Sequence, residues 1–382
     1  MKASVVICTY NREQLIEASI LAVQRQDFSQ EFYEILVVDN NSTDRTKEIV
    51  HRLIPPSPVS IRYIFEENQG LSFARNAGIN NAKGEVVVFT DDDIDAEPNW
   101  LKDIVAAFDD PQVACAGGPI RPIWPFPKPE WLTERWQGPL TISEFKPAKD
   151  AGEFKGPYYP WGANIAFRKD VFQTTGMFPT DLGRIGNCLL SNEEINLCRK
   201  IEESGKRIKF APNAIIHHKI APERIRKIWL HHRTYWQGRS CAVLDINTGR
   251  NIYSQLRANT IKLQNLAKGN SDTFERRCIS KEIFGYFHQL IEGTPNEGRV
   301  SVLRRMRALK VVLNLLSDTT SANKASISLQ KPATSPDHIA EIEALKEAIR
   351  VKDAEIEAFR NSLSWRITSP LRSLYDLLRK LG

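Results

Sequence analysis

Apolar and polar positions alternate along the first hundred residues with two different periods. Short β-branched runs predict strands over residues 4–9, 33–38, 61–65 and 85–90, and apolar residues at helical spacing predict helices over 12–25, 44–53, 71–82 and 98–108. Strict alternation of strands and helices is typical of crossover units, which build a mainly parallel sheet covered by helices on both faces. The pattern therefore predicts an α/β fold.

Polar residues follow each of the four predicted strands. The four segments are Thr9-Tyr10-Asn11, Asp39-Asn40-Asn41, Glu66-Glu67-Asn68 and Asp91-Asp92-Asp93. Ligands of open α/β sheets bind in the crevice beyond the carboxyl ends of the strands. We therefore expect these polar segments to lie along one edge of the sheet, at a binding site.

The pattern changes after residue 117. Residues 117–159 are rich in Pro and Trp and predict a long ordered loop, and residues 161–172 return to strand and helix. A helix over 191–205 is predicted by a Ser-x-x-Glu capping signature, which begins at Ser191, and by a Gly stop. Extended chain is expected over 206–220.

Four segments are expected along the whole chain. They are a catalytic domain over 1–220, a helical extension over 221–316, a Ser/Thr/Pro-rich flexible linker over 317–337 and an amphipathic tail over 338–382. Within the helical extension, the segment RTYWQGRS (233–240) suits either an acceptor channel or a packed aromatic helix.

The tail carries apolar residues spaced three and four apart. They are Ile342, Leu345, Ile349, Ile356, Phe359 and Leu363, with a polar interruption at Lys352. This seam is typical of a coiled coil, and a single amphipathic helix explains it equally well. The last stretch mixes aromatic, apolar and basic residues, which suits a helical partner or an anionic membrane surface. We expect the tail to provide self-association or peripheral membrane contact.

Composition narrows the class of protein. The net charge of +6 does not establish nucleic-acid binding, and we expect no nucleic-acid partner. No run of about 18 apolar residues is present, so no transmembrane helix is predicted. The six cysteines are scattered and form no CxxC, which is typical of reduced thiols in a cytoplasmic protein.

The three adjacent carboxylates Asp91, Asp92 and Asp93 repel one another unless a cation compensates them. Mg²⁺ and Mn²⁺ favour oxygen ligands and often take only one or two carboxylates, together with phosphate oxygens. Asp91 and Asp93 lie on one side of an extended backbone, and Asp92 lies on the other. The run therefore indicates a metal held by Asp91 or Asp93 and completed by a diphosphate; the alternative is a solvated acidic turn.

A further carboxylate, Asp39, ends the second predicted strand. An acid in this place often caps a helix, but Asp44 already supplies a cap, so Asp39 is expected to bind a base N–H or a ribose hydroxyl. The sequence contains neither GxGxxG after the first strand nor GxxxxGK[ST], so a glycine cradle for phosphate is not predicted.

Six motifs occur in one order: VVICTYNR, ILVVDNNSTD, NQGLSFARNAG, VVVFTDDD, WGANIAFRK and EEINLCRKI. Together they resemble the inverting glycosyltransferases of family 2, which have the GT-A fold, over roughly residues 1–240. The resemblance implies a nucleotide-sugar donor, a Mn²⁺ or Mg²⁺ ion, and a hydroxyl acceptor on a carbohydrate or lipid-linked glycan.

 The donor that the resemblance implies is a UDP-linked sugar.

The resemblance also assigns roles to single residues. Thr9, Tyr10, Arg12, Asp39, Asn68, Arg75, Asp91 and Asp92 are expected to bind the nucleotide-sugar, with Asp39 at the base, usually uracil. Asp93 is expected to bind the metal, with Asp91 and His217 as further ligands, although a packed imidazole pair explains His217 and His218 equally well. Trp161, Gly162 and Asn164 are expected on the acceptor side.

The catalytic base is expected in the acidic pair that opens the helix near residue 193. The second member of this pair is usually Asp in the family, and Glu194 stands there in this chain, while Glu193 stays an alternative. A purely structural reading is that both glutamates favour the positive end of the helix.

Two other functions stay open on the sequence alone. One is a sugar-phosphate nucleotidyltransferase, and the other is a non-catalytic carbohydrate-binding or scaffold protein. For the glycosyltransferase we expect a cytoplasmic location, peripheral to the inner face of the membrane.

Overall fold

The computed structural model describes residues 1–144, 152–186, 188–250 and 273–292, and isolated positions between 252 and 262. The chain divides into two compact units, Met1–Ile252 with Asp272–Thr294, and Tyr253–Ser271 with Pro295–Gly382. All the helices and strands named below belong to the first unit. The predicted linker 317–337 and tail 338–382 lie outside the described residues.

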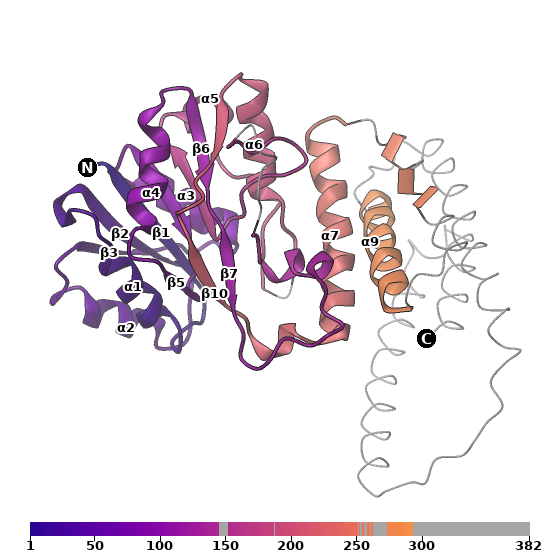
Figure 1. Cartoon of the computed structure of the whole chain (residues 1–382), viewed down its shortest axis with the longest axis horizontal. Helices are drawn as coiled ribbons and strands as arrows, with labels where there is room; N and C mark the ends of the chain where they lie inside the picture. Colours follow the sequence, from indigo (N-terminus) through magenta and orange to yellow (C-terminus); the bar gives the residue numbers. More distant parts are fainter. Residues whose placement is uncertain are drawn as a thin grey trace, which may run out of the picture. The chain divides into compact units, whose positions relative to one another are not determined.

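A seven-stranded sheet forms the centre of the first unit, in the order β3-β2-β1-β4-β8-β6-β9 (Figure 1). Its strands are β1 (Ala3–Thr9), β2 (Tyr33–Asp39), β3 (Ser60–Phe65), β4 (Val86–Thr90), β6 (Val113–Gly117), β8 (Asn164–Arg168) and β9 (Arg207–Phe210). Only β8 runs antiparallel to its neighbours, β4 and β6. The predicted α/β class with a mainly parallel sheet is confirmed.

Helices cover both faces of this sheet. Val5 and Ile7 of β1 pack on one face with α1 (Ile16–Gln24), α2 (Thr46–Leu53) and α4 (Trp100–Ala106). Val6 packs on the other face with α3 (Leu71–Asn81), α5 (Val171–Thr175) and α6 (Glu193–Glu203). Because both faces are buried, the central strands are continuous apolar runs rather than alternating ones.

The four parallel strands β1 to β4 end along one edge, as predicted, because neighbouring parallel strands share one direction.

Helix boundaries differ from the prediction by a few residues. Short 3-10 turns flank several elements: η1 (Gln30–Phe32), η2 (Ala107–Asp109), η3 (Glu134–Trp136), η4 (Gly138–Leu140) and η5 (Pro222–Arg224). The turns η3 and η4 lie in the described part of the Pro- and Trp-rich loop.

The predicted capping signature at Ser191 is wrong. Helix α6 begins one residue later than such a cap requires, after Asn192, whose backbone is left-handed (φ 77°) and whose side chain makes no cap hydrogen bond. The hydroxyl of Ser191 instead accepts a hydrogen bond from Arg233 Nη2 at 3.1 Å. A tertiary hydrogen bond of Ser191 therefore replaces the local cap hydrogen bond that the sequence predicted.

Asn164 connects the large sheet to a second, three-stranded sheet of β5 (Ile94–Ala96), β10 (Ile216–Lys219) and β7 (Ile120–Ile123). Its Nδ2 donates to the carbonyl oxygens of Pro119 at 3.0 Å and Ala214 at 2.8 Å, and its Oδ1 accepts from Trp100 Nε1 at 2.9 Å. Asn164 is fully buried. The structure thus corrects the expectation that Asn164 faces the acceptor, because its amide is committed to the core.

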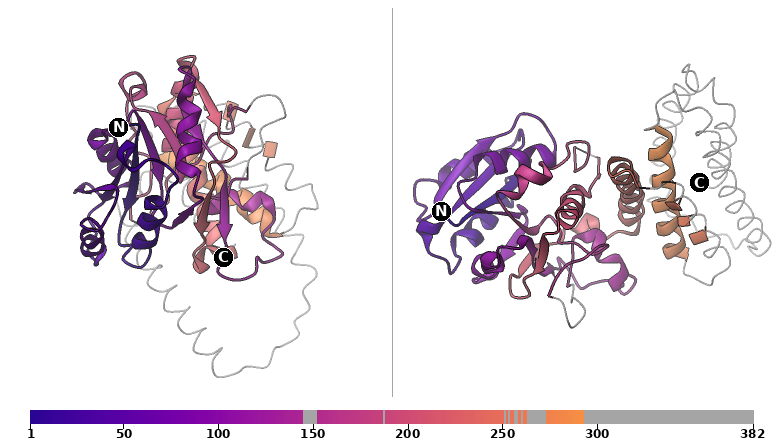
Figure 2. Two further views of the ribbon diagram at one scale, coloured as in Figure 1. Left: turned by 60° about the vertical axis from the view of Figure 1, so that its left-hand side comes forward. Right: turned by 90° about the horizontal axis from the view of Figure 1, so that it is seen from above.

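Two long helices, α7 (Lys227–Asn247) and α9 (Thr273–Glu292), lie side by side in both views (Figures 1 and 2). A glycine on each helix makes this contact close: a Cβ at Gly238 would overlap the carbonyl oxygen of Glu282, and a Cβ at Gly285 would overlap that of Tyr235. Both helices fall in the same compact unit as the sheet. The expected domain boundaries stay predictions.

The described helices include none that is both long enough and apolar enough to cross a membrane.

Replacing Asn164 by Ala should lower the free energy of unfolding by about 3 kcal/mol, because Trp100 Nε1 and two buried carbonyl oxygens lose their partner. Urea denaturation measures the change. The matched control is Asn213→Ala, since Asn213 is exposed in the turn before β10, and such surface changes usually stay within about 0.5 kcal/mol. Equal stabilities of the two variants would contradict the role given to Asn164.

Candidate active site

A cleft of about 1820 Å³ lies at the polar edge of the sheet. Its wall is formed by the ends of β1 and β4, the start of α3, the loops around residues 134–144 and 157–163, the start of α6, and parts of α7 and α9. The cleft is therefore the crevice that the strand order predicts.

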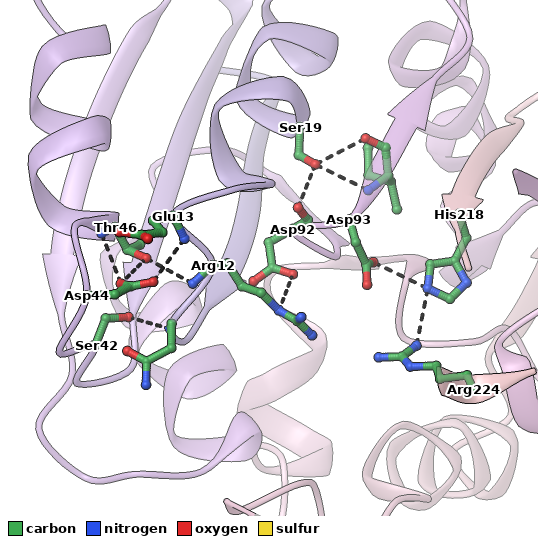
Figure 3. Close-up of polar contacts among 12 residues, drawn as sticks. Arg12, Glu13, Ser19, Ser42, Asp44, Thr46, Asp92, Asp93, His218 and Arg224 are labelled. Carbon is green, nitrogen blue, oxygen red and sulfur yellow. Dashed lines mark hydrogen bonds and ion pairs between the residues drawn. The ribbon is translucent and has the colours of Figure 1, made fainter. Parts of the chain in front are cut away.

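The three aspartates after β4 line this cleft, and Figure 3 shows two of them, Asp92 and Asp93, in different surroundings. Asp92 is buried and lies 3.5 Å from Arg12 Nε, and Asp93 is buried with Oδ1 at 3.4 Å from His218 Nε2. Burial and the charge of Asp93 raise the pKa of Asp92. Burial also acts to raise the pKa of Asp93, but the nearby His218 and Arg224 outweigh it and lower that pKa.

His218, not His217, is the histidine of β10 that lies beside the aspartates (Figure 3). Successive side chains of a strand point to opposite faces, so only one of the two can face Asp93. His217 Nε2 instead lies 2.8 Å from Glu97 Oε1. The structure therefore corrects the predicted ligand from His217 to its neighbour.

The chemistry of this group fits a divalent cation. Asp93 Oδ1 and His218 Nε2 lie 3.4 Å apart on two buried side chains, and a carboxylate oxygen next to an imidazole nitrogen is a donor set that Mn²⁺ accepts. The described residues contain no cluster of three or more His, Cys, Asp or Glu arranged to hold a metal by themselves. The remaining ligands would have to come from water and substrate.

Several residues that were expected to bind the nucleotide line the cleft. Thr9 and Tyr10 follow β1, and Thr9 is buried with its hydroxyl unpaired, whereas Tyr10 is exposed. Arg12 lines the cleft as well, with its side chain 37% exposed, so it retains solvent access despite its contact with Asp92.

Asp39 and Asn68 lie outside the lining of the cleft. The oxygens of Asp39 accept hydrogen bonds from the Tyr63 hydroxyl at 2.7 Å and from the Ser42 backbone N–H at 2.9 Å, and the residue is 1% exposed. Asn68 donates to Glu66 Oε1 through both its backbone and its side chain. Both residues therefore organise loops in this structure, and Asp39 is not the free acceptor that the sequence suggested.

Arg75 and Glu193 form a buried ion pair across the cleft wall. Arg75 comes from α3 and also lies over the rings of Phe89 at 5.9 Å and Phe178 at 5.3 Å. Gly162 makes room for it, since a Cβ at this position would overlap Arg75 Nη2. Gly162 and Trp161, both expected on the acceptor side, line the cleft.

Glu194 differs from Glu193 in its surroundings. The Oε2 atoms of both glutamates are buried without a hydrogen-bond partner, but only Glu193 forms an ion pair among the described residues. Burial first, and then the charge of Glu193, raise the pKa of Glu194 to about 7. A carboxylate with a pKa near neutrality suits proton transfer at physiological pH.

Four arginines of the cleft were not predicted: Arg135, Arg184, Arg224 and Arg233. Arg233 lies in the segment RTYWQGRS, which the sequence offered as an acceptor channel or a packed helix. One signal was available, because Arg233 follows the apolar Leu230 by three residues, and this spacing places both on one face of a helix. Burial and the charge of Arg184 lower the pKa of Arg233 to about 10.

Comparison with known proteins assigns the chain to a family. Residues 4–176 match the model for glycosyl transferase family 2. A glucosyl-dolichyl phosphate glucuronosyltransferase of Haloferax volcanii is 31% identical over 252 residues, which cover 64% of this chain and 78% of the relative. The glycosyltransferase AglE of the same organism is 29% identical over 225 residues, covering 57% of this chain and 67% of the relative.

A solved mannosyltransferase of Pyrobaculum calidifontis, in complex with GDP-Man and Mn²⁺, has a TM-score of 0.49 and 19% identity, covering 98% of this chain and 87% of its own. The chain belongs to glycosyltransferase family 2 and is a glycosyltransferase.

Proposed function

We propose that the enzyme moves a sugar from a UDP-linked donor to a hydroxyl group of a carbohydrate or lipid-linked glycan, with inversion at the reacting carbon. One observation carries this proposal: Glu194 and Asp93, which is paired with the buried His218, line the same cleft, although they come from distant parts of the chain. A base and a site for the leaving group are the two parts that a single displacement requires.

Glu194 is proposed as the base that takes the proton from the acceptor hydroxyl. Glu193 is engaged in the ion pair with Arg75, so its carboxylate is turned toward the guanidinium. Glu194 forms no ion pair among the described residues and has a pKa raised to about 7. The pair therefore divides into a positioning residue and a proton acceptor.

Asp93 and His218 are proposed to hold Mn²⁺ or Mg²⁺, with Asp91 nearby. When bound, such an ion supplies charge compensation for the diphosphate that departs. Arg224 lies 3.5 Å from His218 Nε2 through its Nη1 atom and places a further positive charge on this side of the cleft. Thr9, Tyr10 and Arg12 are proposed to contact the nucleoside from the end of β1.

A lipid-linked glycan is proposed as the acceptor class. The name of the Haloferax relative describes transfer to a glucosyl-dolichyl phosphate, which is a sugar linked to a lipid. With such an acceptor the enzyme would work in the cytoplasm, at the inner face of the membrane. The tail would then provide the membrane contact or self-association expected from its sequence.

Replacing Asp93 by Ala should reduce the Mn²⁺-dependent affinity for UDP by more than about tenfold, because a charged ligand of the ion is lost. Calorimetric titration of UDP with and without Mn²⁺ measures it. Asp95→Ala is the matched control, since Asp95 is exposed and pairs with Arg25 at 3.6 Å outside the cleft. Unchanged Mn²⁺-dependent binding of UDP in the Asp93 variant would contradict the assignment of Asp93 as a metal ligand.

Replacing Glu194 by Gln should keep UDP binding but slow transfer on the order of 10²–10⁴-fold, because the amide is nearly isosteric and takes no proton. Glu193→Gln should instead lower the free energy of unfolding by about 3 kcal/mol, because Arg75 is left buried without its partner. Transfer assays and urea denaturation separate the two effects. A stable, inactive Glu193 variant beside an active Glu194 variant would show that Glu193 is the base.

The pH profile of the native enzyme gives an independent test of the base. Since Glu194 must be deprotonated and its pKa is about 7, kcat/KM should rise about tenfold per pH unit below that pH and level off above it. UDP affinity with Mn²⁺ is measured at each pH as the control for donor binding. A midpoint near 4.5, the ordinary value for a glutamate, would contradict the raised pKa.

A further inference from the structure

Arg233 is a buried arginine whose guanidinium is only partly used. The residue is 4% exposed, and Nη2 donates to the Ser191 hydroxyl at 3.1 Å. Nε and Nη1 are buried and donate to no group of the described residues. Arg233 lines the cleft, so these free donors belong to its wall.

A structural role for Arg233 would predict a different pattern of hydrogen bonds. Arg168 provides the comparison, because its Nε donates to the Val113 carbonyl oxygen at 3.2 Å and its Nη2 donates to that of Phe108 at 2.7 Å. A buried cation without such partners is costly, and the cost is offset when an anion binds. The contrast therefore points to a ligand for Arg233.

The surroundings of Arg233 favour an anionic ligand. Arg184 lies close enough for its charge to lower the pKa of Arg233, so two like charges share this wall. Within the described part of the chain, neither Arg184 nor Arg233 forms an ion pair with a carboxylate. Ser191 and Gln237 add polar groups to the same wall.

The leaving diphosphate is not the anion that this position suits. The carboxylates that act on Arg233 are Glu194 and Glu193, whereas those that act on Arg224 are Asp93 and Asp91; the charge of Arg184 acts on both arginines. In an inverting displacement the base works on the face of the sugar opposite to the leaving group. A cation beside the base therefore faces the acceptor or the transferred sugar.

We propose that Arg233, together with Arg184 and Ser191, forms a subsite for an oxyanion, a phosphate or carboxylate, that is carried by the acceptor or by the transferred sugar and is separate from the donor diphosphate. The placement of the subsite rests on the proposed function, which assigns Glu194 to one side of the cleft and Asp93 to the other. Such a subsite would make the enzyme select acidic substrates.

The test uses the full chain saturated with UDP and Mn²⁺, so that the site for the diphosphate is filled. Glucose 1-phosphate is titrated as the probe for an acceptor phosphate, with methyl glucoside as its neutral counterpart. In a second arm, with Mn²⁺ but without UDP, UDP-glucuronate and UDP-glucose are compared as probes for a carboxylate on the transferred sugar. The native chain should favour the acidic member of one pair, and that pair identifies the source of the anion.

Arg233→Gln should remove this preference, with a loss of about tenfold or more in affinity for the acidic probe, as expected when one partner of a charged hydrogen bond is lost. Arg233→Lys should retain part of the preference. Arg226→Gln is the matched control, since it removes the same charge from an exposed position outside the cleft. Arg184→Gln gives a second, half-buried position, where the change is less disruptive to the fold.

Three outcomes would overturn the subsite: no preference for either acidic probe, an unchanged preference in Arg233→Gln, or an equal loss of affinity for UDP itself in that variant. The last would place Arg233 at the diphosphate. If the native chain does not bind UDP with Mn²⁺, the proposed function fails. Titration of glucose 1-phosphate without nucleotide then still decides whether Arg233 binds a phosphate.

Discussion

The buried ion pair between Arg75 and Glu193 is the interaction on which the site depends. It connects α3, which follows β3, to the first turn of α6, so two elements from distant parts of the chain are fixed at one wall of the cleft. Gly162 leaves the space that the guanidinium occupies. Because the pair is buried, removal of either partner leaves an uncompensated charge.

The same pair gives the two adjacent glutamates different properties. The ion pair with Arg75 compensates the charge of Glu193, while Glu194 is buried next to it and binds its proton more tightly than an exposed glutamate. The raised pKa of Glu194 is therefore caused by its neighbour and by exclusion from water, rather than by any feature of its own side chain. Across the cleft, Asp93 is kept ionised by His218 and Arg224, so the two carboxylates that matter lie in opposite electrostatic surroundings.

The sequence predicted the fold well because buried strands and crossover helices leave strong periodic signals. It also predicted the polar edge, since parallel strands must end together. It failed where a side chain is chosen by tertiary contacts. The choice between His217 and His218 depends on which face of β10 is turned toward Asp93. The amide of Asn164 donates to carbonyl oxygens that are 45 and 50 residues away along the chain. Arg233 lies on a helix whose position no local pattern encodes.

The glycine contact between α7 and α9 has a consequence for how this enzyme can change. Gly238 lies on the same helix as Arg233, and its neighbour Glu282 belongs to α9 and lines the cleft as well. The separation of these two helices thus sets the width of one wall of the cleft. Substitutions that add a methyl group at this helix crossing can then alter the substrate range in evolution. They lie at positions that touch no substrate, and they leave the side chains of the cleft unchanged in type.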